Sequence, residues 1–253
     1  MSQTEFSDKV VFVTGGGRNL GFAIASAFAE KGARVGIAVR GNAAEGEAAV
    51  AELERLGAKA MLTLGDVADP AVCRSMVDSV AKTLGPIDIL VNAVGIRPHH
   101  AFAEISLEEW RQVFDTNCSS AFYLSQAVLP GMVERGFGRI ISLGGSGPGR
   151  AGPKHSHISV SKAGLQMMMS EIAMEYGQHG VTANTVVPGP MDTTRLHPPP
   201  SGWPPSREML MKRLAVPRLG KPREIAAACV YLAGEDAGYV TGQVLRVNGG
   251  QEC

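Results

Sequence analysis

The amino-acid sequence predicts an α/β protein built on a Rossmann-type, doubly wound parallel sheet. Three observations carry this prediction. Short β-branched runs alternate with longer segments of helical periodicity, those runs are almost continuously apolar, and a glycine-rich turn follows the first of them. Continuous apolar character is typical of strands that are covered on both faces, as in a parallel sheet flanked by helices. Alternation sustained along one chain then implies right-handed crossovers between parallel strands.

The pattern sets the expected elements in order. Strands are predicted over residues 9–14, 34–38, 60–64, 87–92, 139–143, 181–187 and 244–247. Helices are predicted over residues 21–31, 44–56, 71–84, 106–113, 158–176 and 223–232. No repeat or break in composition divides the chain, so residues 1–253 are expected to form one domain. Residues 197–205 hold five prolines and fit neither a helix nor a central strand, which predicts a substrate loop around residues 195–208.

Composition excludes several classes of function. The 253 residues include 24 basic and 24 acidic side chains, a balance that gives no reason to expect nucleic acid or an anionic membrane as a partner. The first eight residues do not resemble a signal peptide, and no apolar run is long enough to span a bilayer. The four cysteines lie far apart without a Cys/His cluster, which indicates reduced thiols in a cytoplasmic protein and no metal site.

The glycine-rich turn is the first candidate site. Residues 14–21 read TGGGRNLG, between the first strand and the first helix. Backbone N–H groups and the positive end of a helix dipole meet at such a turn and can face a pyrophosphate. Taken alone the motif is weak evidence, because glycines also serve merely to make tight bends. As a nucleotide site, the turn predicts cofactor contacts from Gly15, Arg18, Asn19, Leu20 and Gly21.

Further motifs follow in a fixed order along the chain. They are Asp66-Val67 after the third strand, Asn92-Ala93-Val94-Gly95 after the fourth, Asn117 within DTN, SKAGL at residues 161–165, Asn184, Pro188-Gly189 with Thr193, RLGKP at residues 218–222, and Thr241-Gly242 with Asn248-Gly249-Gly250. In order and spacing, these motifs resemble those of the short-chain dehydrogenase/reductase family, and in particular its 3-oxoacyl-acyl-carrier-protein-reductase-like members. The resemblance runs over nearly the whole chain.

The resemblance assigns the remaining cofactor contacts. It implies that Asp66 and Val67 contact the adenine, and that Pro188, Gly189, Met191 and Thr193 lie at the nicotinamide end. It also implies that the part of the cofactor between these two ends is contacted by Asn92, Ala93, Gly95 and Lys162. Asn19 departs from the pattern, because the family has a glycine at this place. Asparagine tolerates left-handed backbone angles better than other non-glycine residues, so the turn is still expected to form.

The end of the second strand bears on the choice of nucleotide. Enzymes that select NAD place an acid there to bind the adenosine 2′-hydroxyl. That position is Val39, followed by Arg40, and Arg18 points to the same neighbourhood in the resembled fold. Arginine binds phosphate through a planar fork of donors. The sequence therefore favours NADP(H), although each arginine could also be an ordinary surface charge.

The catalytic set is incomplete. In the resembled family a tyrosine four residues before the helix lysine supplies a proton, a serine thirteen residues earlier binds the same substrate oxygen, and an asparagine holds a proton relay. Here Lys162 and Asn117 match, but Ile158 and Gly145 stand at the tyrosine and serine positions. Neither side chain can donate a proton.

Three nearby side chains are candidate substitutes. Ser146 lies one residue from the serine position, and His155 and His157 flank the tyrosine position. Imidazole is the commonest general acid/base near neutral pH. On a helix, however, residue 157 projects about 100° away from residue 158. Both histidines could equally be surface residues of a polar loop.

These observations favour an NADP(H)-dependent oxidoreductase with an atypical active site, acting on a small carbonyl or related substrate. Two alternatives stay open: a non-redox lyase or isomerase that uses His155 or His157 with the nucleotide as scaffold, and a non-catalytic nucleotide-binding subunit. The resemblance also implies a homotetramer, packed in part through the helix at residues 158–176. Met167, Met168 and Met169 on that helix are interpreted as core or interface residues, and Trp203 either as a cover over an apolar substrate or as an ordinary surface residue.

Overall fold

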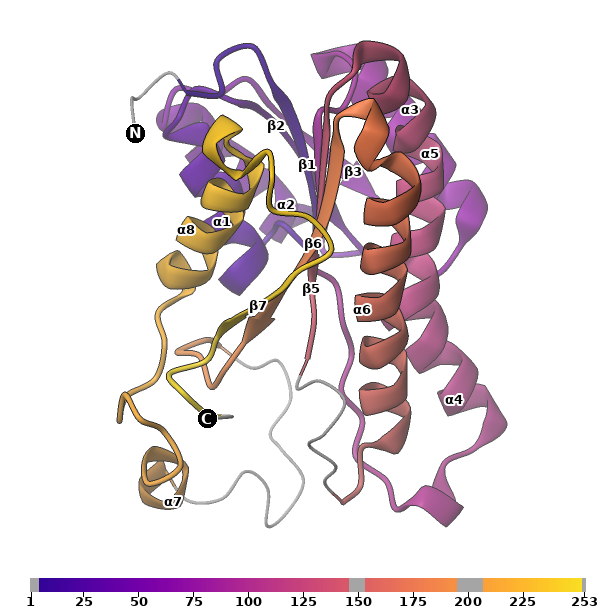
Figure 1. Ribbon diagram of the computed structural model, residues 1–253, viewed down its shortest axis with the longest axis vertical. Helices are drawn as coiled ribbons and strands as arrows, with labels where there is room; N and C mark the ends of the chain where they lie inside the picture. Colours follow the sequence, from indigo (N-terminus) through magenta and orange to yellow (C-terminus); the bar gives the residue numbers. More distant parts are fainter. Residues whose placement is uncertain (1–4, 146–152, 195–206, 252–253) are drawn as a thin grey trace.

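All seven strands of the sheet run parallel. The computed structural model describes residues 5–145, 153–194 and 207–251. The strands lie side by side in the order β3-β2-β1-β4-β5-β6-β7 (Figure 1). Their bounds are Val10–Thr14 for β1, Arg34–Val39 for β2, Ala60–Leu64 for β3, Ile89–Asn92 for β4, Gly138–Leu143 for β5, Val181–Pro188 for β6 and Val244–Val247 for β7. The strand order reverses between β1 and β4, and a crevice opens at the carboxyl ends of strands at such a point.

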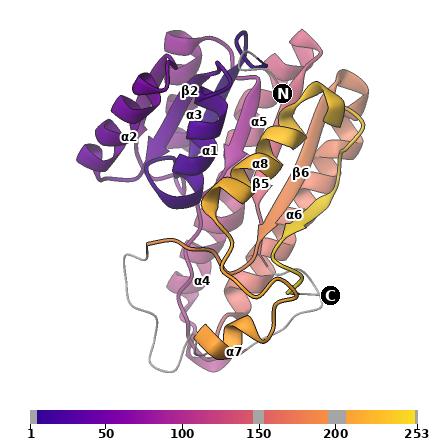
Figure 2. The same ribbon diagram turned by 90° about the vertical axis from the view of Figure 1, so that its left-hand side faces the viewer.

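Helices cover both faces of the sheet. On one face lie α1 (Asn19–Ala29), α2 (Ala43–Arg55) and α8 (Pro222–Ala233), and on the other α3 (Pro70–Leu84), α5 (Ser120–Arg135) and α6 (Ser156–Tyr176), as Figures 1 and 2 show. Two shorter helices, α4 (Leu107–Phe114) and α7 (Arg207–Met211), lie at the end to which the strands point. A π-helical turn, Asp115–Ser119, joins α4 to α5, and short 3-10 turns occupy Phe102–Glu104, Gly177–His179 and Glu235–Ala237.

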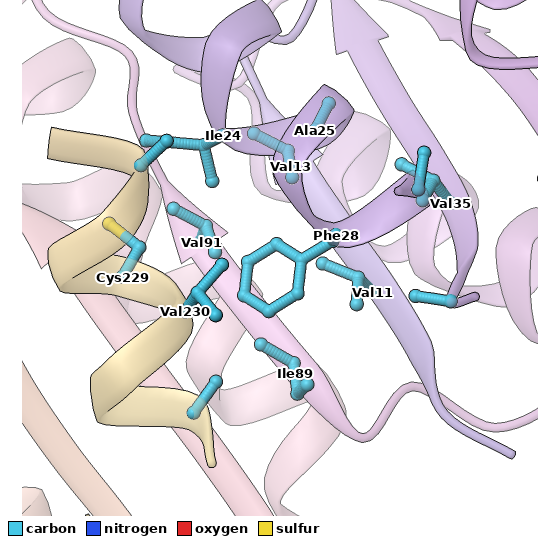
Figure 3. Close-up of a cluster of buried hydrophobic side chains, with 14 of the residues drawn as sticks. Val11, Val13, Ile24, Ala25, Phe28, Val35, Ile89, Val91, Cys229 and Val230 are labelled. Carbon is cyan, nitrogen blue, oxygen red and sulfur yellow. The ribbon is translucent and has the colours of Figure 1, made fainter. Parts of the chain in front are cut away.

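Each face of the sheet has its own apolar core. Figure 3 shows the Phe28 ring of α1 among Val11, Ile89 and Val230, which come from two strands and α8. Phe28 has no exposed surface, and truncating such a side chain costs about 3–5 kcal/mol. The central strands are buried along their whole length, whereas β7 at the sheet edge is only partly buried.

The predicted fold class is confirmed, and most predicted elements are found within one or two residues. Their ends follow from local capping: Asn42 accepts from Glu45 N to begin α2, and Asp69 accepts from Ala71 N to begin α3. One long helix, α5, is not among the predicted elements. It carries Pro130 inside its last turns, and proline usually signals the end of a helix.

Candidate functional site

The glycine turn forms a tight cradle at the amino end of α1. Gly15 has a φ of 68°, and a Cβ on Gly21 would lie 2.1 Å from the carbonyl oxygen of Gly15, so only glycine fits at residue 21. The N–H of Gly15 donates to the carbonyl of Ala38 at 2.9 Å, which fastens the turn to β2. Arg18 caps α1 without a side-chain hydrogen bond to it. The first N–H groups of the helix therefore face the turn as donors, an arrangement that fits a pyrophosphate.

Asn19 takes the left-handed conformation that its place in the turn demands, with a φ of 49°. Its side chain also reaches across to the segment after β6. Nδ2 donates to the carbonyl of Thr194 at 2.9 Å, and Oδ1 accepts the Thr194 N–H at 3.0 Å. The glycine turn is thereby joined to the segment that carries Met191 and Thr193.

Charged side chains gather where β2 ends. The guanidinium of Arg40 lies 4.0 Å from the carboxylate of Asp66, and Nε of Arg18 lies 3.9 Å from Oε1 of Glu45. Asp66 also accepts from the N–H of Ala68 at 3.0 Å. The structure thus brings Arg18 and Arg40 to the same end of the crevice as Val39.

Glu45 was missed by sequence reasoning, which expected basic groups and no carboxylate beside them. The residue lies six positions beyond Val39, in the first turn of α2. The signal that could have found it is Asn42 followed three residues later by a glutamate, a pattern that marks the start of a helix. A helix start there turns the glutamate back toward the glycine turn.

Lys162 and Asn117 meet at Gly95, at the centre of the carboxyl edge. A Cβ on Gly95 would lie 3.4 Å from both Asn117 Oδ1 and Lys162 Nζ. Lys162 Nζ donates to the carbonyl of Leu143 at 2.8 Å. Burial, with a smaller effect of the Arg97 charge, lowers the pKa of Lys162 to about 7. A buried ammonium with so low a pKa changes charge near neutral pH.

Asn117 lies in the π-helical turn, and two hydrogen bonds to the backbone of Ile96 fix its side chain. Its Oδ1 accepts from the N–H of Ile96 at 2.8 Å, and its Nδ2 donates to the carbonyl of Ile96 at 3.1 Å. Asn92 is fixed in a similar way, since its Nδ2 donates to Ser142 Oγ at 3.2 Å. Single π-helical turns of this kind are frequent at functional sites.

Ile158 and Gly145 come from two separate segments near Lys162, α6 and the segment that follows β5. Ile158 stands one helical turn before Lys162 on α6, so their side chains share a face of the helix. A Cβ on Gly145 would lie 3.2 Å from Lys162 Cγ. Lys162 therefore has the alkyl side chain of Ile158 on one side and the backbone of Gly145, without a side chain, on another. Ser146 and Trp203 fall outside the described residues.

The two candidate histidines are placed differently. His157 has no exposed surface, and its Nε2 lies 3.0 Å from Glu109 Oε1 on α4. The interpretation of His157 as a surface residue is therefore wrong. Burial lowers its pKa, although Glu109 acts in the opposite direction. His155 is partly exposed, with Nδ1 2.8 Å from the carbonyl of Pro153.

The segment predicted to contact the nicotinamide follows β6 and packs against the end of β7. The N–H of Gly189 donates to the carbonyl of Val247 at 3.1 Å, and a Cβ on Gly189 would lie 2.6 Å from Asn248 Cα. Met191 pairs with Gly220 in an isolated bridge. These contacts hold residues 189–194 at the carboxyl edge, opposite the glycine turn.

Two negative observations concern the described residues only. None of the helices in this part of the chain is long and apolar enough to cross a membrane. The same residues contain no group of three or more histidine, cysteine or acidic side chains placed to hold a metal ion.

Comparison with known proteins gives consistent matches over nearly the whole chain. Residues 15–252 match a family model described as enoyl-(acyl carrier protein) reductase. The chain is 37% identical to nodulation protein G of Azospirillum brasilense, over 96% of this chain and 98% of that protein. It is 34% identical to L-rhamnose 1-dehydrogenase (NAD(P)(+)) of Sphingomonas sp. (strain SKA58), over 96% and 95% of the two chains. To the 3-oxoacyl-[acyl-carrier-protein] reductase of Escherichia coli (strain K12) it is also 34% identical, over 97% and 98%.

Solved structures agree with these matches. A blue fluorescent protein from a metagenomic library, in complex with NADPH, has a TM-score of 0.89 and 36% identity, covering 98% of this chain and 100% of that one. A dehydrogenase/reductase from Sinorhizobium meliloti 1021 has a TM-score of 0.90 and 30% identity, covering 99% and 98%.

Proposed function

The chain belongs to the short-chain dehydrogenase/reductase family, and on that premise we propose that it is an NADP(H)-dependent oxidoreductase with an atypical active site. Its substrate is a small carbonyl compound or a related one. The observation that carries the proposal is the meeting of Lys162 and Asn117 at Gly95, on the carboxyl edge that the glycine turn shares. The relatives include reductases and a dehydrogenase, which supports oxidoreductase chemistry in this chain.

The proposed cofactor is NADP(H), which supplies or accepts the hydride when bound. The Gly15–Gly21 cradle fits its pyrophosphate, and Arg18 and Arg40, which lie near the end of β2, are the residues proposed to bind a 2′-phosphate. The NADPH complex of the blue fluorescent protein, at 36% identity, supports the same choice. In this assignment Asp66 and Val67 adjoin the adenine, and residues 188–193 adjoin the nicotinamide.

Lys162 is the residue proposed to take over the proton chemistry. A carbonyl oxygen that receives negative charge during reduction needs a nearby cation and then a proton. Lys162 Nζ can provide both when protonated, and it lies beside Asn117, whose side chain is fixed in place. Ile158 and Gly145 contribute no donor, so of the family's tyrosine, serine and lysine positions only that of Lys162 carries a group that can donate a proton.

A second candidate function, that of a non-catalytic subunit, rests on Ile158 and Gly145. With Ile158 and Gly145 in place, the chain can bind a nucleotide and yet fail to turn a substrate over, as a non-catalytic subunit would. The lyase or isomerase alternative has less support, since fully buried His157 lies against Glu109. His155 is partly exposed, so it is the histidine on which the lyase or isomerase alternative now depends.

The test is a panel of carbonyl, imine and activated-alkene substrates with NADPH, followed at 340 nm. Stoichiometric loss of absorbance with substrate consumption supports the oxidoreductase. Substrate consumption without that loss supports a lyase or isomerase. Tight NADPH binding with no turnover across the panel supports the non-catalytic subunit and contradicts the proposed activity.

We also propose a homotetramer in the cytoplasm. A groove of about 490 Å³ runs between α5 and α6, lined in part by Phe122, Leu129, Val133, Met168, Ile172 and Tyr176. An apolar groove of this kind suits a second copy of the chain. Met169 packs in the core, so only part of the methionine run faces outward. Cys73, Cys118 and Cys229 are free thiols, which suits a reducing compartment.

A further inference from the structure

Glu45 lies at the adenosine end of the proposed cofactor site. The Asn42 side chain accepts the N–H of Glu45 at 3.2 Å and so fixes the first turn of α2. From that turn the Glu45 side chain reaches back until Oε1 is 3.9 Å from Arg18 Nε. The carboxylate is half-buried rather than free in solvent, with 27% of the side chain exposed.

The same carboxylate also borders the end of β2. A Cβ placed on Gly17 would lie 3.1 Å from Val39 Cγ1 and 3.2 Å from Glu45 Oε1. The Val39 side chain and the Glu45 carboxylate therefore border one small space beside the glycine turn. The Val39 side chain cannot accept a hydrogen bond, but Glu45 brings two carboxylate oxygens to the neighbourhood from α2 instead of from β2.

We propose that Glu45 is a specificity-determining residue that weakens binding of the 2′-phosphate and supports binding of a 2′-hydroxyl. This proposal rests on the proposed function, because it concerns how this chain distinguishes the two nicotinamide nucleotides. The carboxylate competes with phosphate for Arg18 and repels phosphate directly. It can also accept a hydrogen bond from a ribose hydroxyl, the role that an acid at residue 39 would have. Glu45 thus reduces the NADPH preference that Arg18 and Arg40 create.

The size of the effect follows from Coulomb's law. Two unit charges about 4 Å apart in water interact with an energy that corresponds to roughly fivefold in a binding constant. A 2′-phosphate carries more than one negative charge near neutral pH, so a carboxylate at such a separation would change the binding constant by about fivefold or more at low salt. Salt screens charges at a partly exposed site, so the effect should shrink as ionic strength rises.

The test compares Glu45→Gln with Glu47→Gln. Glutamine keeps the size of the side chain and removes its charge. Glu47 lies on the same helix, exposed to solvent, so its substitution changes the net charge equally without touching Arg18. Dissociation constants for NADPH and NADH are measured by nucleotide fluorescence, at roughly 50 mM and 500 mM salt. Glu45→Asp, which withdraws the carboxylate by one methylene, is measured in the same way.

Glu45→Gln should tighten NADPH binding by about fivefold or more at low salt and leave NADH unchanged or weaker. Glu45→Asp should fall between wild type and Glu45→Gln, and Glu47→Gln should match wild type. If NADPH binds but Glu45→Gln leaves the ratio of the two dissociation constants within about twofold of wild type, the role of Glu45 is wrong and the proposed function stands. If wild-type protein binds neither nucleotide, the proposed function fails and this proposal fails with it.

Discussion

The side-chain amide of Asn19 pairs with the backbone of Thr194 through two hydrogen bonds, although the residues are 175 positions apart. The pair joins the two sides of the crevice at the carboxyl ends of the strands. One partner belongs to the glycine turn and the other to the segment after β6. We therefore expect Asn19 to act on the segment as well as on the turn.

Replacing Asn19 with glycine separates these two roles. Glycine accepts the φ of 49° without strain and removes both hydrogen bonds. The amide of Thr194 should then exchange with solvent faster, and bound NADPH should dissociate faster by roughly two- to thirteenfold, the factor to which one net hydrogen bond of about 0.5–1.5 kcal/mol corresponds. Hydrogen exchange and stopped-flow nucleotide release measure the two effects.

Asn19→Asp serves as the control for this prediction. Aspartate can still accept the N–H of Thr194 but cannot donate to its carbonyl, so Thr194 exchange should be intermediate. Unchanged exchange in Asn19→Gly would mean that the two hydrogen bonds do not restrain the segment.

Arg40 should determine much of the preference for NADPH. The native protein is expected to bind NADPH at least about tenfold more tightly than NADH, a difference of ~1.4 kcal/mol. Arg40→Asp should abolish or reverse this preference, because a carboxylate would replace a phosphate-binding guanidinium near Asp66. Fluorescence titration with both nucleotides checks the prediction, and equal dissociation constants in the native protein would refute it. Arg55→Asp on the outer end of α2 is a control for the change of net charge.

The charge of Lys162 should govern the pH dependence of turnover. Its pKa is lowered to about 7 by burial and by Arg97. As pH rises through about 7 the ammonium loses its proton, and with it the ability to stabilise and protonate a substrate oxyanion. Carbonyl reduction, measured as kcat/KM, should therefore be full below this pKa and fall above it.

Two variants of Lys162 test the assignment. Lys162→Met should give a low kcat/KM that does not fall as the pH rises through about 7. Lys162→Arg, if it folds, should move this fall, the basic limb of the pH profile, to higher pH because arginine stays charged. A limb that persists near pH 7 in Lys162→Met would assign it to another group.

The missing hydroxyls should be recoverable. Ile158→Tyr combined with Gly145→Ser should raise ketone reduction, since a positioned acid contributes typically ~10²–10⁴ in rate. A serine Cβ at residue 145 would lie 3.2 Å from Lys162 Cγ, so a shift of a few tenths of an ångström must accompany it. NADPH binding confirms that the variant is intact before a ketone panel is assayed.

Ile158→Phe with Gly145→Ser is the matched control, because it adds the same ring without the hydroxyl. A gain in both double variants would assign it to the serine hydroxyl or to a change of pocket shape, and not to the tyrosine hydroxyl. No gain in the tyrosine variant, with NADPH still bound, would favour the non-catalytic subunit.

The groove between α5 and α6 should be an interface. Phe122 is 48% exposed at its rim, and Phe122→Glu would place a charge there. Light scattering should show a tetramer for the native protein and smaller species for this variant. Phe102→Glu, which changes an exposed phenylalanine before α4, should leave the tetramer intact. A native monomer at micromolar concentration would count against the proposal.

Local patterns were sufficient to predict most of the fold. Strands such as Ala60–Leu64 are short apolar runs with clear turn signals at both ends, and the structure reproduces their bounds. Helix α5 was not predicted because it starts from a π-helical turn and contains Pro130, and each of these departs from the usual helix signals. The burial of His157 depends on the packing of α4 against α6, which no local pattern contains.

Motif spacing predicted candidate residues of the site but not the contacts between them. Lys162, Asn117 and Gly95 were identified from their order in the chain, and their convergence came from the sheet. The Glu45–Arg18 and Asn19–Thr194 pairs could not be predicted, since both depend on how separate loops meet in space.

The pairing of β1 with β4 has a consequence for synthesis on the ribosome. The N–H of Val10 donates to the carboxylate of Asp88, 78 residues later, and Val11 is in register with Ile89. At about 5–20 residues per second, the ribosome needs several seconds after making β1 before it has made β4. Throughout that time one edge of a mostly apolar strand has no partner, and such an edge can pair with another chain. Conditions that slow elongation between residues 14 and 89 should therefore lower the yield of soluble protein more than an equal delay near the end of the chain.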